Sequence, residues 1–151
     1  MSIFNAINTS GSGLTAQRLR MDTISSNIAN ADTTRATVNA DGEYEPYRRK
    51  MTVFSPKDQS FSSILNRTTQ RGETTGDGVK VSQIVDDEEP FKQVYNPNHP
   101  DANEDGYVEM PNVDPLKEMV DMMSATRSYE ANVTSLNASK TMLMKALEIG
   151  K

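Results

Sequence analysis

Apolar residues recur every seven positions near both ends of the chain, and this spacing limits the possible folds more than any other feature. With one intermediate position, the N-terminal row comprises Ile7, Leu14, Met21, Ile24 and Ile28. Residues seven apart lie on one face of an α-helix, as they do in coiled coils. We therefore expect a helix over residues 1–35, although its Gly, Ser, Thr and Asn residues lower its intrinsic helix propensity.

A longer row follows Asp114 and Pro115. This pair is typical of a helix start, because Asp caps the first turn and Pro suits the first helical position. The row steps by threes and fours and comprises Met119, Met122, Thr126, Tyr129, Val133, Leu136, Lys140, Leu143 and Leu147. The pattern predicts a second helix over residues 114–151. Its apolar face widens at Met119 to Met123 and again at Leu143 to Leu147, which predicts surface left over for other subunits.

Residues 36–113 have a different texture, with five of the eight Gly and six of the seven Pro. Two β-like runs, 47–54 and 79–85, favour two to four strands, and the stretch 67–78 favours a hairpin tip or a mobile loop. The expected fold class is mainly α with a small β middle region. The two terminal helices pair as a coiled coil and, with the insert between them, form one domain.

Composition narrows the function classes. The chain has 151 residues, no Cys and a net charge of −5. The absence of Cys excludes disulfides and Cys-ligated zinc, and the acidic balance argues against nucleic acid as a partner. There is no apolar run of the length that a membrane-spanning helix needs, and the N-terminus lacks the basic and apolar regions of a secretory signal peptide. If the protein is exported, we expect another route.

The stretch 101–112, DANEDGYVEMPN, matches the opening of an EF-hand calcium loop, with oxygen-bearing residues at positions 1, 3 and 5 and Gly at position 6. Position 12, however, is Asn112 instead of a bidentate Glu. In addition, Pro97 and Pro100 prevent a helix from leading into the loop. We therefore interpret the stretch as a surface turn, with a positive φ at Gly106 and an extended segment from Tyr107.

No constellation of residues indicates catalysis. His99 is the only histidine and stands beside a Pro in a predicted loop. The acidic run 86–89 is interpreted as a solvated turn, and the basic cluster 48–50 as a strand edge. We predict a protein that is not an enzyme, with no catalytic residue, no cofactor and no metal.

The terminal sequences resemble those of a known family. Residues 14–34, LTAQRLRMDTISSNIANADTT, contain the core Asn27-Ile28-Ala29-Asn30 with Thr33, and resemble the N-terminal signature of bacterial flagellar rod, hook and hook-associated proteins. Residues 129–151 resemble the matching C-terminal element of the same family. The central NPNHPDANEDGYVEMPNVD and the ending KALEIGK are similar to the proximal-rod members, so the resemblance covers roughly half the chain.

This resemblance implies a structural subunit of the flagellar basal-body rod, placed in the periplasm or cell-wall zone. The paired terminal helices would line the axial structure and the middle region would face outward. Implied partners are copies of itself, proximal and distal rod proteins, ring and adaptor components, and the flagellar type III export apparatus. Nucleic acid and a direct membrane span are not implied. The chain ends would be disordered before assembly, since burial in the polymer must offset their ordering entropy.

Under this hypothesis the coiled-coil and assembly residues are Ile7, Leu14, Met21, Ile24, Asn27, Ile28, Asn30, Met119, Met123, Tyr129, Val133, Leu136, Leu143 and Leu147. The two asparagines either end the first helix or bond across subunits. The apolar residues also suit an ordinary intramolecular core. The alternative from a different function class is a soluble calcium-binding or coiled-coil adaptor protein.

Overall fold

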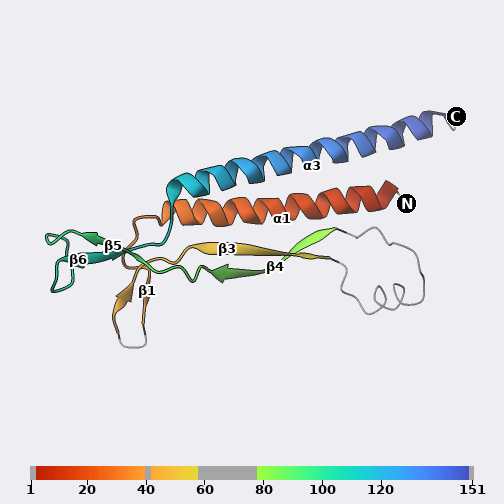
Figure 1. Cartoon of the computed structure of the whole chain (residues 1–151). Coiled ribbons are helices and arrows are strands. Elements are labelled where there is room, and N and C mark those ends of the chain that lie inside the picture. The colour runs from red at the N-terminus through yellow and green to blue at the C-terminus, as the bar shows by residue number, and fades with distance from the viewer. Residues whose placement is uncertain (1–2, 40–41, 58–77, 150–151) are drawn as a thin grey trace.

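The computed structural model describes residues 3–39, 42–57 and 78–149 (Figure 1). In chain order its elements are α1 (Ile3–Ala29), β1 (Thr37–Val38), β2 (Tyr44–Glu45), β3 (Lys50–Pro56), β4 (Val79–Asp86), β5 (Lys92–Tyr95), β6 (Tyr107–Met110) and α3 (Pro115–Ile149). Along the chain, two long helices thus flank a middle region of short strands. The predicted mainly-α class with a small β middle is confirmed. No helix of the described residues is long and apolar enough to cross a membrane.

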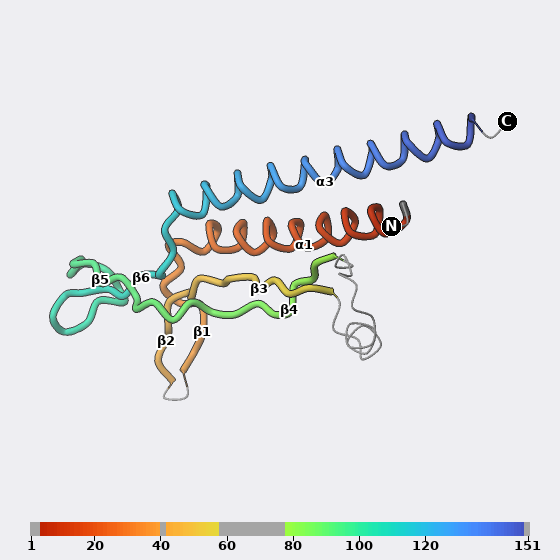
Figure 2. Tube along the Cα trace, turned by 45° about the vertical axis from the view of Figure 1, so that its right-hand side comes forward, coloured from red at the N-terminus to blue at the C-terminus, as the bar shows by residue number. Residues whose placement is uncertain are grey.

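The two helices lie side by side and run in opposite directions (Figure 1). Their register follows from two contacts: Ser10 Oγ lies 3.5 Å from Ser135 Oγ, and Arg20 Nη2 lies 3.1 Å from an Asp121 carboxylate oxygen. The predicted pairing of the terminal helices is therefore confirmed. Toward the C-terminus α3 diverges from α1 and continues past its beginning (Figure 2).

The opposite side of α1 is covered by an antiparallel ladder of β3 and β4, so α1 forms the middle layer between α3 and the strands. The ladder runs from the Lys50–Asp86 pair to the Pro56–Val79 pair, with an irregularity between Val53 and Phe54. Both predicted β-like runs are confirmed as strands. The hairpin tip or loop predicted over 67–78 lies outside the described residues, apart from Gly78.

Two further antiparallel pairs, β1–β2 and β5–β6, lie beyond the end of α1 (Figure 1). The described residues therefore hold six strands, whereas the sequence favoured two to four. The additional strands have no apolar alternation to reveal them. The strands β1 and β2 are two residues long, and all four residues of β5 are exposed.

Helix α3 begins as its sequence predicts, because the Asp114 carboxylate accepts a hydrogen bond of 3.0 Å from the Leu116 N–H. Helix α1 forms over 27 residues despite its poor propensity. Several of its hydroxyls bond back to its own carbonyls, as Thr15 Oγ1 does to Gly11 O and Thr23 Oγ1 to Leu19 O. Packing on α3 and on the strands supplies the stability that propensity lacks.

Candidate functional site

The face that joins α1 to α3 consists largely of small and polar residues. On α3 it follows a row of Glu118, Ala125, Asn132 and Ser139, and on α1 a row of Gly13, Arg20 and Asn27. Each row precedes the predicted apolar row by one residue, which is a rotation of about 100° around the helix. The predicted apolar rows lie beside this face and still meet across the pair, since Thr126 Oγ1 lies 3.7 Å from Met21 Sδ.

Close approach of the two backbones explains this displacement. A Cβ atom added at Gly13 would lie 3.1 Å from the amide atoms of Asn132, so a larger side chain meets an obstacle there. Nearby, Ala16 and Ala125 are buried at 3% and 0% exposure. A seam of small residues lets the helices pack tightly and pushes the bulky apolar side chains to its flanks.

The predicted assembly residues fall into three groups by exposure. Ile24 is buried. The half-buried group flanks the seam and comprises Ile7, Leu14, Met21, Tyr129, Val133, Leu136 and Leu143. The exposed group comprises Ile28, Met119, Met123 and Leu147. The exposed members contribute little to a core within the chain, and the assembly role of all of them stays a prediction.

A buried polar cluster, here called the junction, ties the end of α1 to the strands and to α3. At its centre Asn27 is only 1% exposed. Its Nδ2 donates to Lys50 O at 2.9 Å and to Glu118 Oε2 at 3.0 Å. Its Oδ1 accepts from Lys50 N at 2.9 Å and from the Tyr47 hydroxyl at 3.0 Å. Asn27 therefore forms its hydrogen bonds inside the chain. Only two roles were expected for it from the sequence, ending the helix or bonding to another subunit, and neither describes these bonds.

Three carboxylates of the junction surround one guanidinium. Arg49 donates from Nε to Glu118 Oε1 at 2.6 Å and from Nη1 to Asp87 Oδ2 at 3.2 Å, and Asp121 lies 3.5 Å from its Nη2. Burial opposes the charge of Arg49, yet its bonds to Glu118 and Asp87 outweigh burial and raise its pKa. The Glu89 N–H, and then Arg49, lower the pKa of Asp87 against the opposing effect of burial. Glu118 is 0% exposed, so its bonds to Arg49 and Asn27 lie in the interior.

Asn30 agrees with the first of its two predicted roles, a place at the end of the helix. Its Nδ2 donates to Ser26 O at 2.9 Å, and its Oδ1 accepts from Thr33 Oγ1 at 3.2 Å, one residue beyond the last turn of α1. Ser26 O also accepts from the Asn30 N–H at 3.1 Å, so the side chain adds a second bond to the last turn. Asn30 thus lies at the end of the first helix, and its role in assembly stays a prediction.

The stretch 101–112 is a turn, as its sequence predicts. Gly106 has a φ of 81°, its N–H bonds Asn103 O at 2.8 Å, and β6 begins at Tyr107. The carboxylate of Asp101 accepts from Thr34 Oγ1 at 2.9 Å and from Arg35, which lowers the pKa of Asp101. Within the described ranges, no three His, Asp or Glu side chains converge as metal ligands would.

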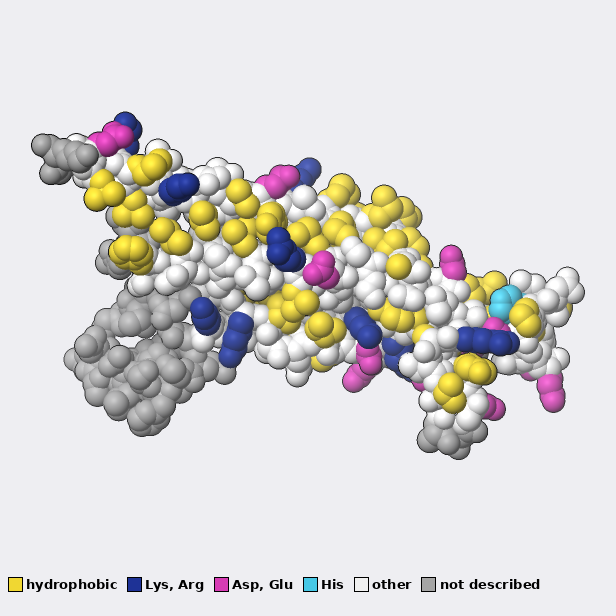
Figure 3. All heavy atoms as spheres, turned by 180° about the vertical axis from the view of Figure 1, so that it is seen from behind, with side chains coloured by type: hydrophobic (Ala, Val, Ile, Leu, Met, Phe, Trp, Pro, Cys, Tyr) yellow, Lys and Arg dark blue, Asp and Glu magenta, His cyan; other side chains and the backbone are white. Residues whose placement is uncertain are grey.

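Two groups of large apolar side chains on α3 lie open to solvent. The start patch comprises Leu116, Met119, Val120 and Met123, which are 54% to 74% exposed. The end patch comprises Met142, Met144, Leu147 and Ile149, which are 49% to 85% exposed. In Figure 3 apolar side chains line the exposed side of the helix pair. Surfaces of this kind mark contacts with other proteins.

Comparison with known proteins agrees with this geometry. The family described as "Flagella basal body rod protein" matches residues 7–37, and the family described as "Flagellar basal body rod FlgEFG protein C-terminal" matches residues 104–149. The chain is also similar over its whole length to a protein named flagellar basal-body rod protein FlgC from Bacillus subtilis (strain 168), with 61% identity over 151 residues and all of both chains covered. The chain belongs to the flagellar basal-body rod protein family.

More distant relatives that carry the same name are also similar over nearly their whole length. That of Borreliella burgdorferi is 44% identical over 161 residues, covering 99% of this chain and 98% of its own. That of Salmonella typhimurium is 41% identical over 151 residues and all of both chains. The protein is a structural component of the flagellar basal-body rod and not an enzyme, and it assembles with copies of itself and with other basal-body components.

Sequence reasoning identified the Asn27 motif of this rod protein but missed most of its bonding partners. Tyr47, Arg49, Asp87 and Glu118 lie in segments interpreted as a strand edge, a solvated turn and a helix start. One available signal was the seven-residue spacing between Glu118 and Ala125, which places an acidic residue on the same helix face as a small apolar one.

Proposed function

We propose that the protein is a proximal-rod subunit that polymerises through the uncovered faces of its terminal helices. In that arrangement the helix pair faces the axis and the strand region faces outward as parts of one domain. The polymer contributes to the drive shaft and to the wall of the export channel. The helices thereby transmit torque by packing, without chemistry.

The observation that carries this proposal is the exposure of the start and end patches. Burying one side chain of this size is worth about 1.5–3 kcal/mol. A chain that leaves eight of them exposed on one helix has a strong driving force for association. Such exposure is costly for a protein that remains a monomer.

The placement of the patches also suits a helical polymer. They lie at opposite ends of α3, and their residues differ. Contacts between unlike surfaces do not pair off into closed dimers but extend into rings or filaments. Proximal and distal rod proteins, ring and adaptor components and further copies of the chain are the partners that this proposal assigns to these surfaces.

Passage through the flagellar type III export apparatus requires helices that separate readily. The seam between α1 and α3 supports this, because its small residues bury little apolar area. The chain ends would then order on assembly, with burial of the patches offsetting the entropy cost.

A double substitution in the start patch tests the proposal. The Val120→Ser and Met123→Ser variant should be exported and folded, yet be missing from purified basal bodies, with loss of motility. Val38→Ser with Val94→Ser is the matched control, because both side chains are exposed on outer strands. Normal motility and normal incorporation of the Val120–Met123 variant would overturn the proposal.

A further inference from the structure

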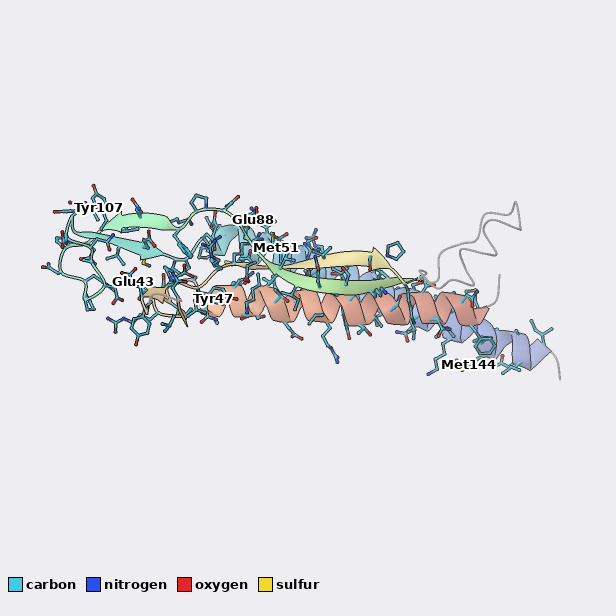
Figure 4. The ribbon with its side chains drawn as sticks, turned by 90° about the horizontal axis from the view of Figure 1, so that it is seen from below. Glu43, Tyr47, Met51, Glu88, Tyr107 and Met144 are labelled. Carbon is cyan, nitrogen blue, oxygen red and sulfur yellow. The ribbon has the colours of Figure 1, made fainter. Side chains whose placement is uncertain are left out.

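The β5–β6 hairpin extends from the end of the molecule opposite to the chain termini. Figure 4 shows Tyr107 at this tip and Met144 at the far end of the helix pair. Within the described residues β5 and β6 pack on each other and on no other helix or strand. On one face of the hairpin Val108 is buried at 2% exposure, whereas its cross-strand partner Val94 is 48% exposed. The other face is left without a partner.

That second face carries two tyrosines. Tyr95 pairs with Tyr107 and Gln93 pairs with Glu109, and alternation along the strands places all four on the same side. The two rings meet edge to face with centroids 5.3 Å apart. Tyr95 and Tyr107 remain 65% and 44% exposed, so this edge-to-face pair presents aromatic surface to solvent. Aromatic rings held in this way are typical anchors of protein interfaces.

Charge indicates what this face binds. Residues 86–114 contain nine Asp and Glu but a single Lys, a net charge of −8, and of these acidic residues Asp87 and Asp101 pair with Arg49 and Arg35 from outside this range. The whole chain carries −5, so the remainder carries +3. Glu109 stands beside the tyrosines, is exposed, and its carboxylate pairs with no other described residue. A partner segment with cationic side chains complements this surface.

The chain already shows this chemistry with its own Arg35, and Arg48 shows the stacking on an aromatic ring alone. The Arg35 guanidinium lies 5.2 Å from the centre of the Tyr44 ring while it pairs with Asp101. The Arg48 guanidinium lies 4.4 Å from the centre of the Phe91 ring. A guanidinium binds well between a ring face and a carboxylate, because it stacks on one and donates to the other. The Tyr95–Tyr107 face with Glu109 offers this arrangement without an arginine of its own.

We propose that the face formed by Tyr95, Tyr107 and Glu109 docks an arginine-bearing segment of a neighbouring protein. The identification of the neighbour as a basal-body component rests on the proposed function. The preference for arginine rests on the residues of this face alone. The contact is separate from the apolar patches of α3, which lie on other elements. It would fix the outer hairpin against a neighbour while the helices form the axial contacts.

A peptide titration tests the chemistry on the full-length free protein. The probe is a blocked Gly-Arg-Gly-Arg-Gly peptide, compared with its Lys counterpart, and the readout is the aromatic NMR signals of Tyr95 and Tyr107. The Arg peptide should shift these two signals and bind more tightly than the Lys peptide. Glu109→Gln should weaken binding by about threefold, whereas Glu43→Gln on the other hairpin should not. Equal effects of both peptides, or no shift at these rings, would overturn the proposal.

Cross-linking in cells tests the partner. A photoreactive residue in place of Tyr95 should give an adduct in purified basal bodies that maps to a segment containing Arg, and Glu109→Lys should abolish it while Glu43→Lys leaves it. An adduct on a segment without Arg, or one that Glu109→Lys does not affect, contradicts the docking site. If the protein is missing from basal bodies altogether, the proposed function fails, and the peptide titration alone decides the chemistry of this face.

Discussion

The two ends of the helix pair differ in what they bury. At the end near the strands, the junction holds buried Asn27 and Glu118 in a network with Arg49 and Tyr47. At the end near the chain termini, α3 diverges from α1, and Met144, Leu147 and Ile149 lie open to solvent. Among the described residues, buried charge is confined to the junction end, whereas exposed apolar surface occurs at both ends, in the start patch and in the end patch.

This contrast separates what holds the monomer from what holds the polymer. A buried ionic network adds little net stability, because desolvation offsets the attraction between its charges. It does, however, specify which groups pair, because a buried polar group left without a hydrogen-bond partner costs folding free energy. The junction therefore fixes how the strands leave the helices, while the start and end patches keep their apolar surface for neighbours.

Glu118→Ala should cause the largest loss in stability. It removes the carboxylate that neutralises buried Arg49 and leaves an Asn27 N–H without its acceptor. Breaking a buried pair in this way costs about 3–5 kcal/mol. Urea denaturation followed by circular dichroism measures it. Glu130→Ala on the exposed face of α3 is the control, and an equally small loss in both variants would show that the junction does not stabilise the fold.

Asn27→Ala should have the next largest effect. The Lys50 N–H and C=O and the Tyr47 hydroxyl would lose partners in a buried setting, at a cost of about 1–3 kcal/mol. The same denaturation measurement applies, with Asn8→Ala on the exposed face of α1 as control. If the two asparagines prove equally dispensable, the bonds around Asn27 are not what ties α1 to the strands.

The sequence reveals the helices far better than it reveals the junction. Heptad spacing and the Asp114 cap report local structure, so the pairing of two terminal helices could be predicted. Which face is buried could not, because large apolar residues lie one position away from the small residues that permit close packing, as Leu14 does from Gly13. The partners of Asn27 come from segments 20 to 91 residues distant along the chain. No local pattern encodes such contacts.

The free energies of unfolding of the Gly13→Ala and Gly11→Ala variants should differ by about 1 kcal/mol. Alanine favours a helix over glycine by about that amount. At Gly11 nothing lies within 4 Å of the new Cβ, so the gain is kept. At Gly13 the Cβ would stand 3.1 Å from Asn132, and displacing that side chain offsets the gain. The two melting temperatures measure the difference, and equal stabilisation would show that the seam is not closely packed.

Acid should loosen the junction end through its carboxylates. The pKa of Asp87 is lowered, first by the Glu89 N–H and then by Arg49. A lowered folded-state value means that Asp87 adds stability above the ordinary Asp pKa of about 3.9, and that this stability is lost as the pH falls through the lowered value. Asp87→Asn should flatten the decline in unfolding free energy below about pH 4. An unchanged decline would place the acid-sensitive group elsewhere.

Leu147→Ser in the end patch should have the smallest effect on the monomer. Its side chain is 74% exposed, so losing it should change the unfolding free energy by about 0.5 kcal/mol or less. Ile24→Ser is the contrasting variant, because Ile24 is 5% exposed and truncation with a buried hydroxyl should cost about 2–4 kcal/mol. Denaturation of both in the same buffer measures the contrast. A substantial loss in Leu147→Ser would mean that the end patch stabilises the free chain, and that the division between the buried junction and the exposed patches does not hold.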